Sequence, residues 1–241
     1  MTETVQAIPL MNLGIAFLPV AVTLVILFRW SVGAGQALYA TLRMLLQLAL
    51  IGYFLAALFN ADHAGIVILV LTLMVFFSSW IALGTVSLQR RQLLTRAFAA
   101  ISIGGGFTLA LTTQGVLKLN PWYDPRLMIP LAGMIFASAM NTVSLAAERM
   151  QSETRRGVAF TEARHQALHA AMIPLINTLL AVGLVSLPGM MTGQILSGVS
   201  PLIAARYQIM VMCIIFGASG ISAACFLSWS RAVFKPPQLS D

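Results

Sequence analysis

The chain has 241 residues, of which 59% are hydrophobic and only 9% are charged, and its mean hydropathy is +0.90. A soluble domain averages about 25% charged residues, so this composition excludes an ordinary globular enzyme. The net charge of +7 is typical of basic cytoplasmic loops in membrane proteins, so we expect membrane lipid as a partner and no nucleic acid.

Apolar stretches long enough to cross a bilayer recur along almost the whole chain, which predicts an all-α integral membrane protein. The first stretch follows an N-terminus without lysine or arginine, so we expect a retained span there and no signal peptide. We expect one transmembrane permease domain over residues 1–241, with a surface segment at 31–42. Its seven spans are expected at 9–28, 44–59, 64–83, 97–117, 127–147, from 172, and at 207–229.

The basic residues are distributed unevenly between the two sides of these spans. Of the 14 lysines and arginines, Lys118, Arg126 and Arg206 fall on one side and the remaining eleven, Arg43 included, on the other. The richer side is expected to be cytoplasmic, which predicts an external N-terminus and a cytoplasmic C-terminus. In this interpretation the spans carry no charged residue away from their ends.

A nucleotide-binding P-loop is missing from the sequence. That motif requires a lysine after a glycine-rich loop, and the only lysines are Lys118 and Lys235, in L-K-L and F-K-P. The chain therefore has no predicted catalytic residue or cofactor, and any ATP must be bound by a partner subunit.

All seven acidic residues lie in loops, tails or at span ends, which argues against a proton-driven carrier. Uncharged polar groups can still bind sodium, so an ion-gradient-driven secondary transporter remains the alternative.

Sulfur-containing residues raise the question of a metal site. Met190 and Met191 could supply thioethers to a soft ion, but methionine is also a common packing residue, and we predict no specific metal site. Cys213 and Cys225 fall in one expected helix about 18 Å apart, so they cannot form an intrachain disulfide.

The most polar connection, residues 148–169, is expected to form two helices joined by a tight turn. Gly157 should end the first helix, and Thr161 can cap the second, with Glu162 in its first turn. This pattern alone is compatible either with an ordinary solvated connection or with a contact to a cytoplasmic ATPase. For such a contact the charged candidates are Glu148, Arg149, Arg155, Arg156, Glu162 and Arg164.

Proline and glycine interrupt the apolar run between the sixth and seventh expected spans. Pro188 and Gly189 should break the helix in the outer leaflet, with residues 190–194 turning near the exit of a pathway. The expected gate and pathway residues are Pro188, Gly189, Met190, Met191, Thr192, Gly193, Gln194, Asn141 and Asn177. Of these, Met190, Thr192 and Gln194 are expected to face the route, whereas Asn141 and Asn177 could instead form interhelical hydrogen bonds.

Glycines recur at two further places where helices could pack closely. Gly104-Gly105-Gly106 marks either a bend or close packing, and Gly217, Gly220 and Ala224 share one face of the last span. That face could pack within the chain or form the seam of a homodimer.

Four segments together carry a family resemblance that covers essentially the whole chain. They are S-L-P-G-M-M-T-G-Q-I-L at 186–196, A-R-Y-Q-I-M-V-M at 205–212, M-N-T-V-S-L-A-A-E-R at 140–149 and R-M-L-L-Q-L at 43–48. They resemble the iron-export ABC permeases of bacteria and their plant relatives linked to aluminium tolerance. The resemblance implies a homodimeric permease in the bacterial inner membrane. It would work with two copies of a separate ATPase, which docks on the 148–169 protrusion, and would export iron or a metal-linked solute.

Overall fold

The structure is a computed structural model that describes residues 8–58 and 63–234. Within these residues the secondary structure is helical, apart from an isolated β-bridge between Val182 and Ser186. This confirms the predicted all-α class. Contacts divide the chain into two units, Met1–Ala61 and Asp62–Asp241, which we describe separately.

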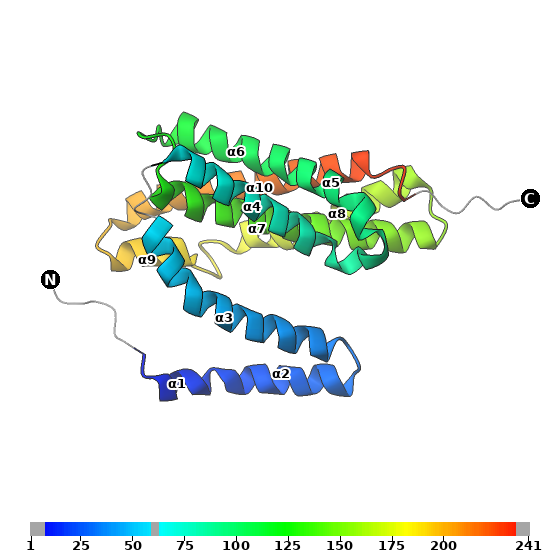
Figure 1. Ribbon diagram of the computed structural model, residues 1–241, viewed down its shortest axis with the longest axis horizontal. Helices are drawn as coiled ribbons and strands as arrows, with labels where there is room; N and C mark the ends of the chain where they lie inside the picture. Colours follow the sequence, from blue (N-terminus) through cyan, green and yellow to red (C-terminus); the bar gives the residue numbers. More distant parts are fainter. Residues whose placement is uncertain (1–7, 59–62, 235–241) are drawn as a thin grey trace, which may run out of the picture. The chain divides into compact units, whose positions relative to one another are not determined.

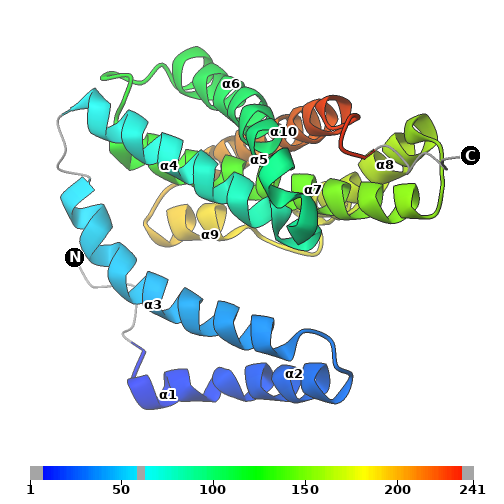
Figure 2. The ribbon, with the colours of Figure 1, turned by 45° about the vertical axis from the view of Figure 1, so that its right-hand side comes forward.

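The first unit is a helical hairpin, drawn in blue in Figures 1 and 2. Helices α1 (Leu10–Ile15) and α2 (Phe17–Arg29) follow each other almost without interruption, and α3 (Ala34–Leu58) runs back beside α2. Gly33 adopts a left-handed φ of 62° in the turn between them. The apolar side chains of α2 are exposed along its length, as expected for a surface in contact with lipid.

The expectation of a surface segment at residues 31–42 was wrong. A single helix begins at Ala34 because residues 36–50 contain neither proline nor glycine, so nothing interrupts it once it has started. Arg43 consequently lies inside α3 and away from its ends, which also corrects its assignment to a loop. Its side chain is exposed and long enough to carry its charge toward a membrane interface.

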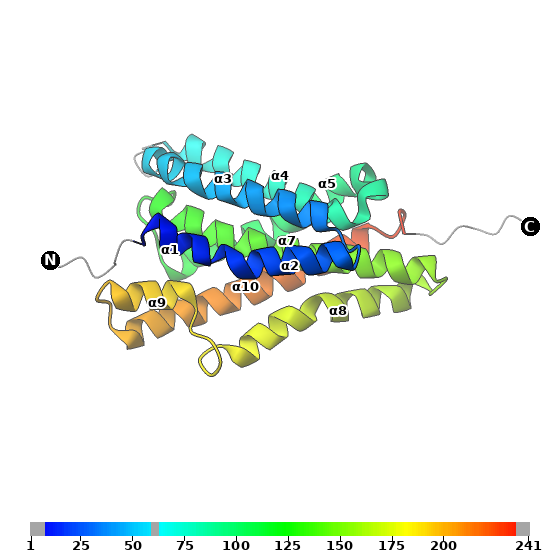
Figure 3. The same ribbon diagram turned by 90° about the horizontal axis from the view of Figure 1, so that it is seen from below.

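The second unit is a helical bundle in which α7 occupies the centre (Figure 3). Its elements in chain order are α4 (Ala64–Ala82), η1 (Leu83–Gln89), α5 (Arg90–Ile101), η2 (Ser102–Gly106), α6 (Phe107–Ala110), η3 (Leu111–Val116), α7 (Pro125–Arg155), α8 (Phe160–Ala181), α9 (Gly189–Leu196) and α10 (Pro201–Trp229). Helix α7 packs against α4, α8 and α10. Cys213 and Cys225 both lie on α10 as free thiols, as predicted.

Six helical segments among the described residues are long and apolar enough to cross a membrane. They are Met11–Arg29, Ala34–Leu55, Ala64–Val86, Arg90–Val116, Pro125–Arg155 and Pro201–Trp229. The predicted seventh span would have to involve α8, which begins with a polar stretch and ends at Ala181. The count of seven spans therefore stays a prediction.

The helix that carries the fourth span begins at Arg90, seven residues before the predicted start of that span at residue 97. One physical reason is that the Arg90 side chain is bound to the end of the preceding helix. Its Nε donates to the carbonyl oxygen of Trp80 at 3.1 Å, and its guanidinium lies 3.6 Å from the centre of the Trp80 ring. Trp80 lies in the last turn of α4, where carbonyl groups lack helical partners.

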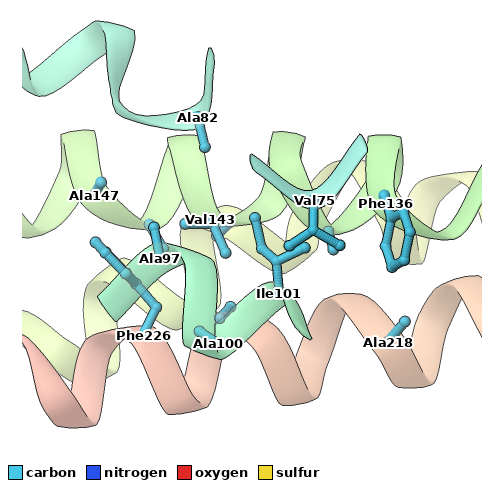
Figure 4. Close-up of a cluster of buried hydrophobic side chains, with 14 of the residues drawn as sticks. Val75, Ala82, Ala97, Ala100, Ile101, Phe136, Val143, Ala147, Ala218 and Phe226 are labelled. Atoms are coloured by element: carbon cyan, nitrogen blue, oxygen red, sulfur yellow. The ribbon is translucent and has the colours of Figure 1, made fainter. Parts of the chain in front are cut away.

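Small side chains form much of the core between α4, α5, α7 and α10. Figure 4 shows Ala97, Ala100 and Ala147 close to the larger Phe226, and these four side chains are fully buried. One polar contact also joins α7 to α10: the hydroxyls of Ser138 and Ser219 share a hydrogen bond of 2.9 Å. Small residues allow helix backbones to approach closely, which is a usual basis of packing in membranes.

Gly104 and Gly105 mark such a close approach, within a short π-helical segment. A Cβ built on Gly104 would lie 2.3 Å from Ser222 Oγ, and one on Gly105 would lie 2.7 Å from the Phe136 ring. The glycine run at 104–106 was predicted to mark either a bend or close helix packing, and the prediction of close packing is therefore confirmed. The face of Gly217, Gly220 and Ala224 makes no comparable approach within the described residues. A Cβ on Gly217 would meet nothing within 4 Å, one on Gly220 would lie at an ordinary 3.7 Å from Met172 Cε, and Ala224 is exposed.

Candidate functional site

A long helix and a tight turn build the first part of the candidate site. Helix α7 has 31 residues, about 46 Å of helix, which exceeds the roughly 30 Å hydrocarbon core of a bilayer. It continues to Arg155, and Gly157 then adopts a φ of 80°. The Val158 N–H donates to the Glu153 carbonyl at 3.1 Å, which closes the turn. The predicted pair of helices with Gly157 as its stop is confirmed.

The cap predicted at Thr161 was wrong. Helix α8 begins at Phe160, Ala159 occupies the capping position, and no side chain caps the helix. Val158 and Ala159 are enough to reverse the chain after Gly157, so the helix starts before Thr161 is reached. Glu162 lies in the first turn as predicted, and its carboxylate accepts a 2.9 Å hydrogen bond from Gln166 Nε2.

A buried carboxylate organises the charges near this turn. Glu153 has a side chain that is only 3% exposed, and its Oε1 lies 2.6 Å from Arg149 Nη2 and 3.7 Å from Arg156 Nη1. Both arginines were predicted to be coupling residues, whereas Glu153 was not. The spacing of Arg149 and Glu153 could have predicted this ion pair, since residues four apart share one helix face.

The other predicted coupling residues remain on the surface. Exposed side chains belong to Glu148, Arg155, Glu162 and Arg164, and that of Arg156 is also largely exposed despite its contact with Glu153. We use the term elbow for residues 149–162, which hold the buried ion pair, the turn and the start of α8. The elbow combines a fixed interior with an exposed, mostly basic exterior.

The second part of the site is the break between α8 and α9, and it lies earlier than predicted. Helix α8 ends at Ala181, Gly183 has a φ of 82°, and residues 182–188 form an irregular loop. Pro188 precedes α9, and Gly189 is that helix's first residue. The expectation that residues 190–194 turn was therefore wrong. Proline is tolerated at a helix start, so Pro188-Gly189 begins a helix here and the break comes before it.

The gate residues on α9 divide between two faces. Met190 is partly buried against the core, and Gln194 is one turn further on the same face. Thr192 lies on the exposed side, where its hydroxyl donates to the Pro188 carbonyl at 3.1 Å. The three residues expected to face a common route are therefore not on one face, because a helix places residues two apart on opposite sides. Gly193 is exposed, and Pro188 and Met191 line a cavity against α10.

Asn141 on α7 and Asn177 on α8 point away from the bundle interior. Both residues are exposed, and neither amide has a hydrogen-bond partner among the described residues. The interpretation as interhelical hydrogen bonds within the chain was wrong, and Ser138 and Ser219 form that type of bond instead. An amide within the apolar part of a span requires a polar partner or water outside this unit.

These observations define a multi-span helical membrane protein with a charged elbow on its longest helix and an interrupted helix beside its last span. The chain belongs to the UPF0014 family, since the model of that family, described as an uncharacterised protein family, matches residues 10–234. This membership confirms the predicted family resemblance.

Three relatives show how widely this family is distributed. The UPF0014 membrane protein slr1647 of Synechocystis is 37% identical over 205 residues, covering 78% of each chain. The probable iron export permease protein FetB of Escherichia coli is 32% identical and covers 84% of this chain and 80% of its own. Protein ALUMINUM SENSITIVE 3 of Arabidopsis thaliana is 31% identical, with coverage of 85% and 80%. No solved structure matches the chain.

Proposed function

We propose that this chain is the membrane-spanning permease subunit of an ATP-driven ABC transporter. A separate ATPase would bind the elbow, and the cargo would be iron or a metal-linked solute moved out of the cell. The observation that carries the proposal is the elbow, where the Arg149–Glu153 ion pair braces the end of α7 and Gly157 turns the chain into α8, with basic side chains outside. The name of the E. coli relative, probable iron export permease protein, supports the choice of cargo and direction.

Force applied at the elbow would reach the bundle along α7. This helix is continuous from Pro125 to Arg155, and its middle section is buried against α4 and α10. The salt bridge between Arg149 and Glu153 lies within its last turns, so the elbow and the helix would move as one body. Closure of the ATPase would then tilt α7 and α8 together.

The transport pathway would lie between two copies of the chain. Asn141 and Asn177 supply exposed amides on the two helices that meet at the elbow, and each needs a polar partner or water. A homodimer with a hydrated interface along α7 and α8 would provide polar partners and water for these amides. The second half of α8, the loop at 182–188 and α9 would together make the seventh crossing, which gives an external N-terminus and a cytoplasmic C-terminus in the bacterial inner membrane.

The first test concerns the ATPase contact. The purified chain should not hydrolyse ATP, and vesicles holding it with its ATPase should move Fe(II) only when ATP is supplied. Charge reversal at Arg155 and Arg156 in the elbow and at Arg164 just after it should lower transport at least tenfold, because this exposed surface would then repel its partner. Arg91→Glu is the matched control, an exposed arginine on α5 outside the elbow, and it should leave transport within about twofold.

Two results would contradict the proposal. Transport driven by an imposed ion gradient without the ATPase would favour a secondary transporter. An equal loss of transport in Arg91→Glu would show that the elbow has no special role.

The second test concerns the gate on α9. With Cys213 and Cys225 replaced by serine, single cysteines are introduced at Met190 and Thr192. Thr192→Cys should react with a membrane-impermeant thiol reagent in every nucleotide state, because that position is exposed. Met190→Cys should react at least fivefold faster in one state, since its face must leave the core when the pathway opens. Equal protection of Met190→Cys in all states would leave α9 a static element.

A further inference from the structure

A cavity between the α8–α9 loop and α10 gathers sulfur atoms from two separate elements. Met191 on α9 and Met212 and Cys213 on α10 line one cavity of about 410 Å³, and Cys213 is exposed. The remaining lining is largely apolar and includes Val182, Leu187 and Pro188. Two thioethers and one thiol are a soft donor set, which is the kind of environment that binds thiophilic ions.

One polar side chain lines the same cavity and has no partner. Gln208 lies one turn before Met212 on α10, is 6% exposed, and its Oε1 forms no hydrogen bond within the described structure. Buried amide oxygens in native proteins are almost always satisfied by protein, water or an ion. A cation bound in the cavity would satisfy this oxygen, which is a second reason to expect a ligand there.

The charge balance decides which ion fits. Among the described residues no carboxylate or histidine lines the cavity, so the Cys213 thiolate would be its only anionic group. A monovalent ion bound to one thiolate is neutral overall, whereas a divalent ion would leave a net positive charge in an apolar site. Soft donors and electroneutrality together favour Cu(I) and Ag(I) over Fe(II) and Zn(II).

We propose that this cavity is a binding site for a thiophilic monovalent cation, held by the sulfurs of Met191, Met212 and Cys213 with Gln208 Oε1 as a weak fourth donor. Binding forms a bond from Cys213 Sγ to the metal and releases the thiol proton to solvent. The oxidation state of the metal does not change. The site is independent of the proposed iron export, because it needs neither an ATPase nor movement of α9.

The test uses the full chain in nanodiscs, with Cys225→Ser so that Cys213 is the only thiol. Cu(I) is titrated under reducing conditions in competition with a Cu(I) chelator. We expect one Cu(I) per chain, and we expect Met191→Leu/Met212→Leu to raise the apparent Kd at least 100-fold. Leucine preserves the apolar volume, so the loss would report the thioethers. Met210→Leu, outside the cavity, should change the Kd less than threefold.

X-ray absorption of the Cu(I)-loaded Cys225→Ser chain gives a readout that requires no substitution in the cavity. Three sulfur neighbours around copper would support the site. One sulfur neighbour, or an unchanged Kd in the double leucine variant, would show adventitious binding to a single thiol and overturn the proposal. The thermal unfolding midpoint of each variant establishes that it is folded.

Discussion

Replacing Gly104 by alanine should destabilise the bundle severely, by about 3 kcal/mol, at the upper end of what overpacking costs. The added Cβ would lie 2.3 Å from Ser222 Oγ, 2.7 Å from Ser222 N and 2.9 Å from the Ala218 carbonyl oxygen. Two of these three atoms belong to the backbone of α10, which cannot yield without moving the whole helix. Thermal unfolding in detergent measures the effect.

Gly106→Ala is the matched control, because that position is in the same glycine run and a Cβ there meets nothing within 4 Å. It should be neutral or stabilising by up to about 1 kcal/mol, the usual gain of alanine over glycine in a helix. Adding Ser222→Ala to Gly104→Ala should restore only part of the stability, since it removes the hydroxyl and leaves the backbone contacts. Equal stability of the Gly104 and Gly106 variants would contradict the close approach of these helices.

Sequence patterns predicted those parts of the fold that depend on local chemistry. The run of apolar residues predicts helices long enough to span a bilayer, and Gly157 predicts where α7 ends, because a left-handed residue is needed at that position. Patterns did less well at helix starts. Residues 31–42 were expected along the membrane surface because they are less apolar, yet no glycine or proline follows Gly35 in this segment to interrupt the helix.

The sequence could not predict which polar and charged side chains are buried. Glu153 has the appearance of one more solvated charge in a polar loop, and only its place between Arg149 and Arg156 in the fold makes it an interior residue. Gln208 and Cys213 are likewise unremarkable within an apolar span, and they become a candidate site only when α9 is placed against α10. Asn141 and Asn177 illustrate the converse, since amides that could have formed hydrogen bonds between helices of the bundle lie on its surface.

The same buried carboxylate leads to the second large effect that we expect. Arg149→Met should destabilise the elbow by about 3 to 5 kcal/mol, because it leaves the Glu153 charge buried with only Arg156, 3.7 Å away. Glu153→Gln should cost less, since Arg149 is 42% exposed and can be solvated by water. The double variant Arg149→Met/Glu153→Met should recover most of the loss, because replacing a buried pair by apolar side chains is often neutral.

Thermal unfolding of these three variants, with Arg91→Met as the exposed control, measures the order of their stabilities. Limited proteolysis at residues 155–159 reports whether the elbow itself has opened. Under the proposed function, transport in vesicles with the ATPase should fall in the same order, since a loosened elbow would not transmit force to α7. An Arg149→Met variant as stable as Arg91→Met would mean that water solvates the Glu153 carboxylate, and the rigid elbow would then be lost as the basis of coupling.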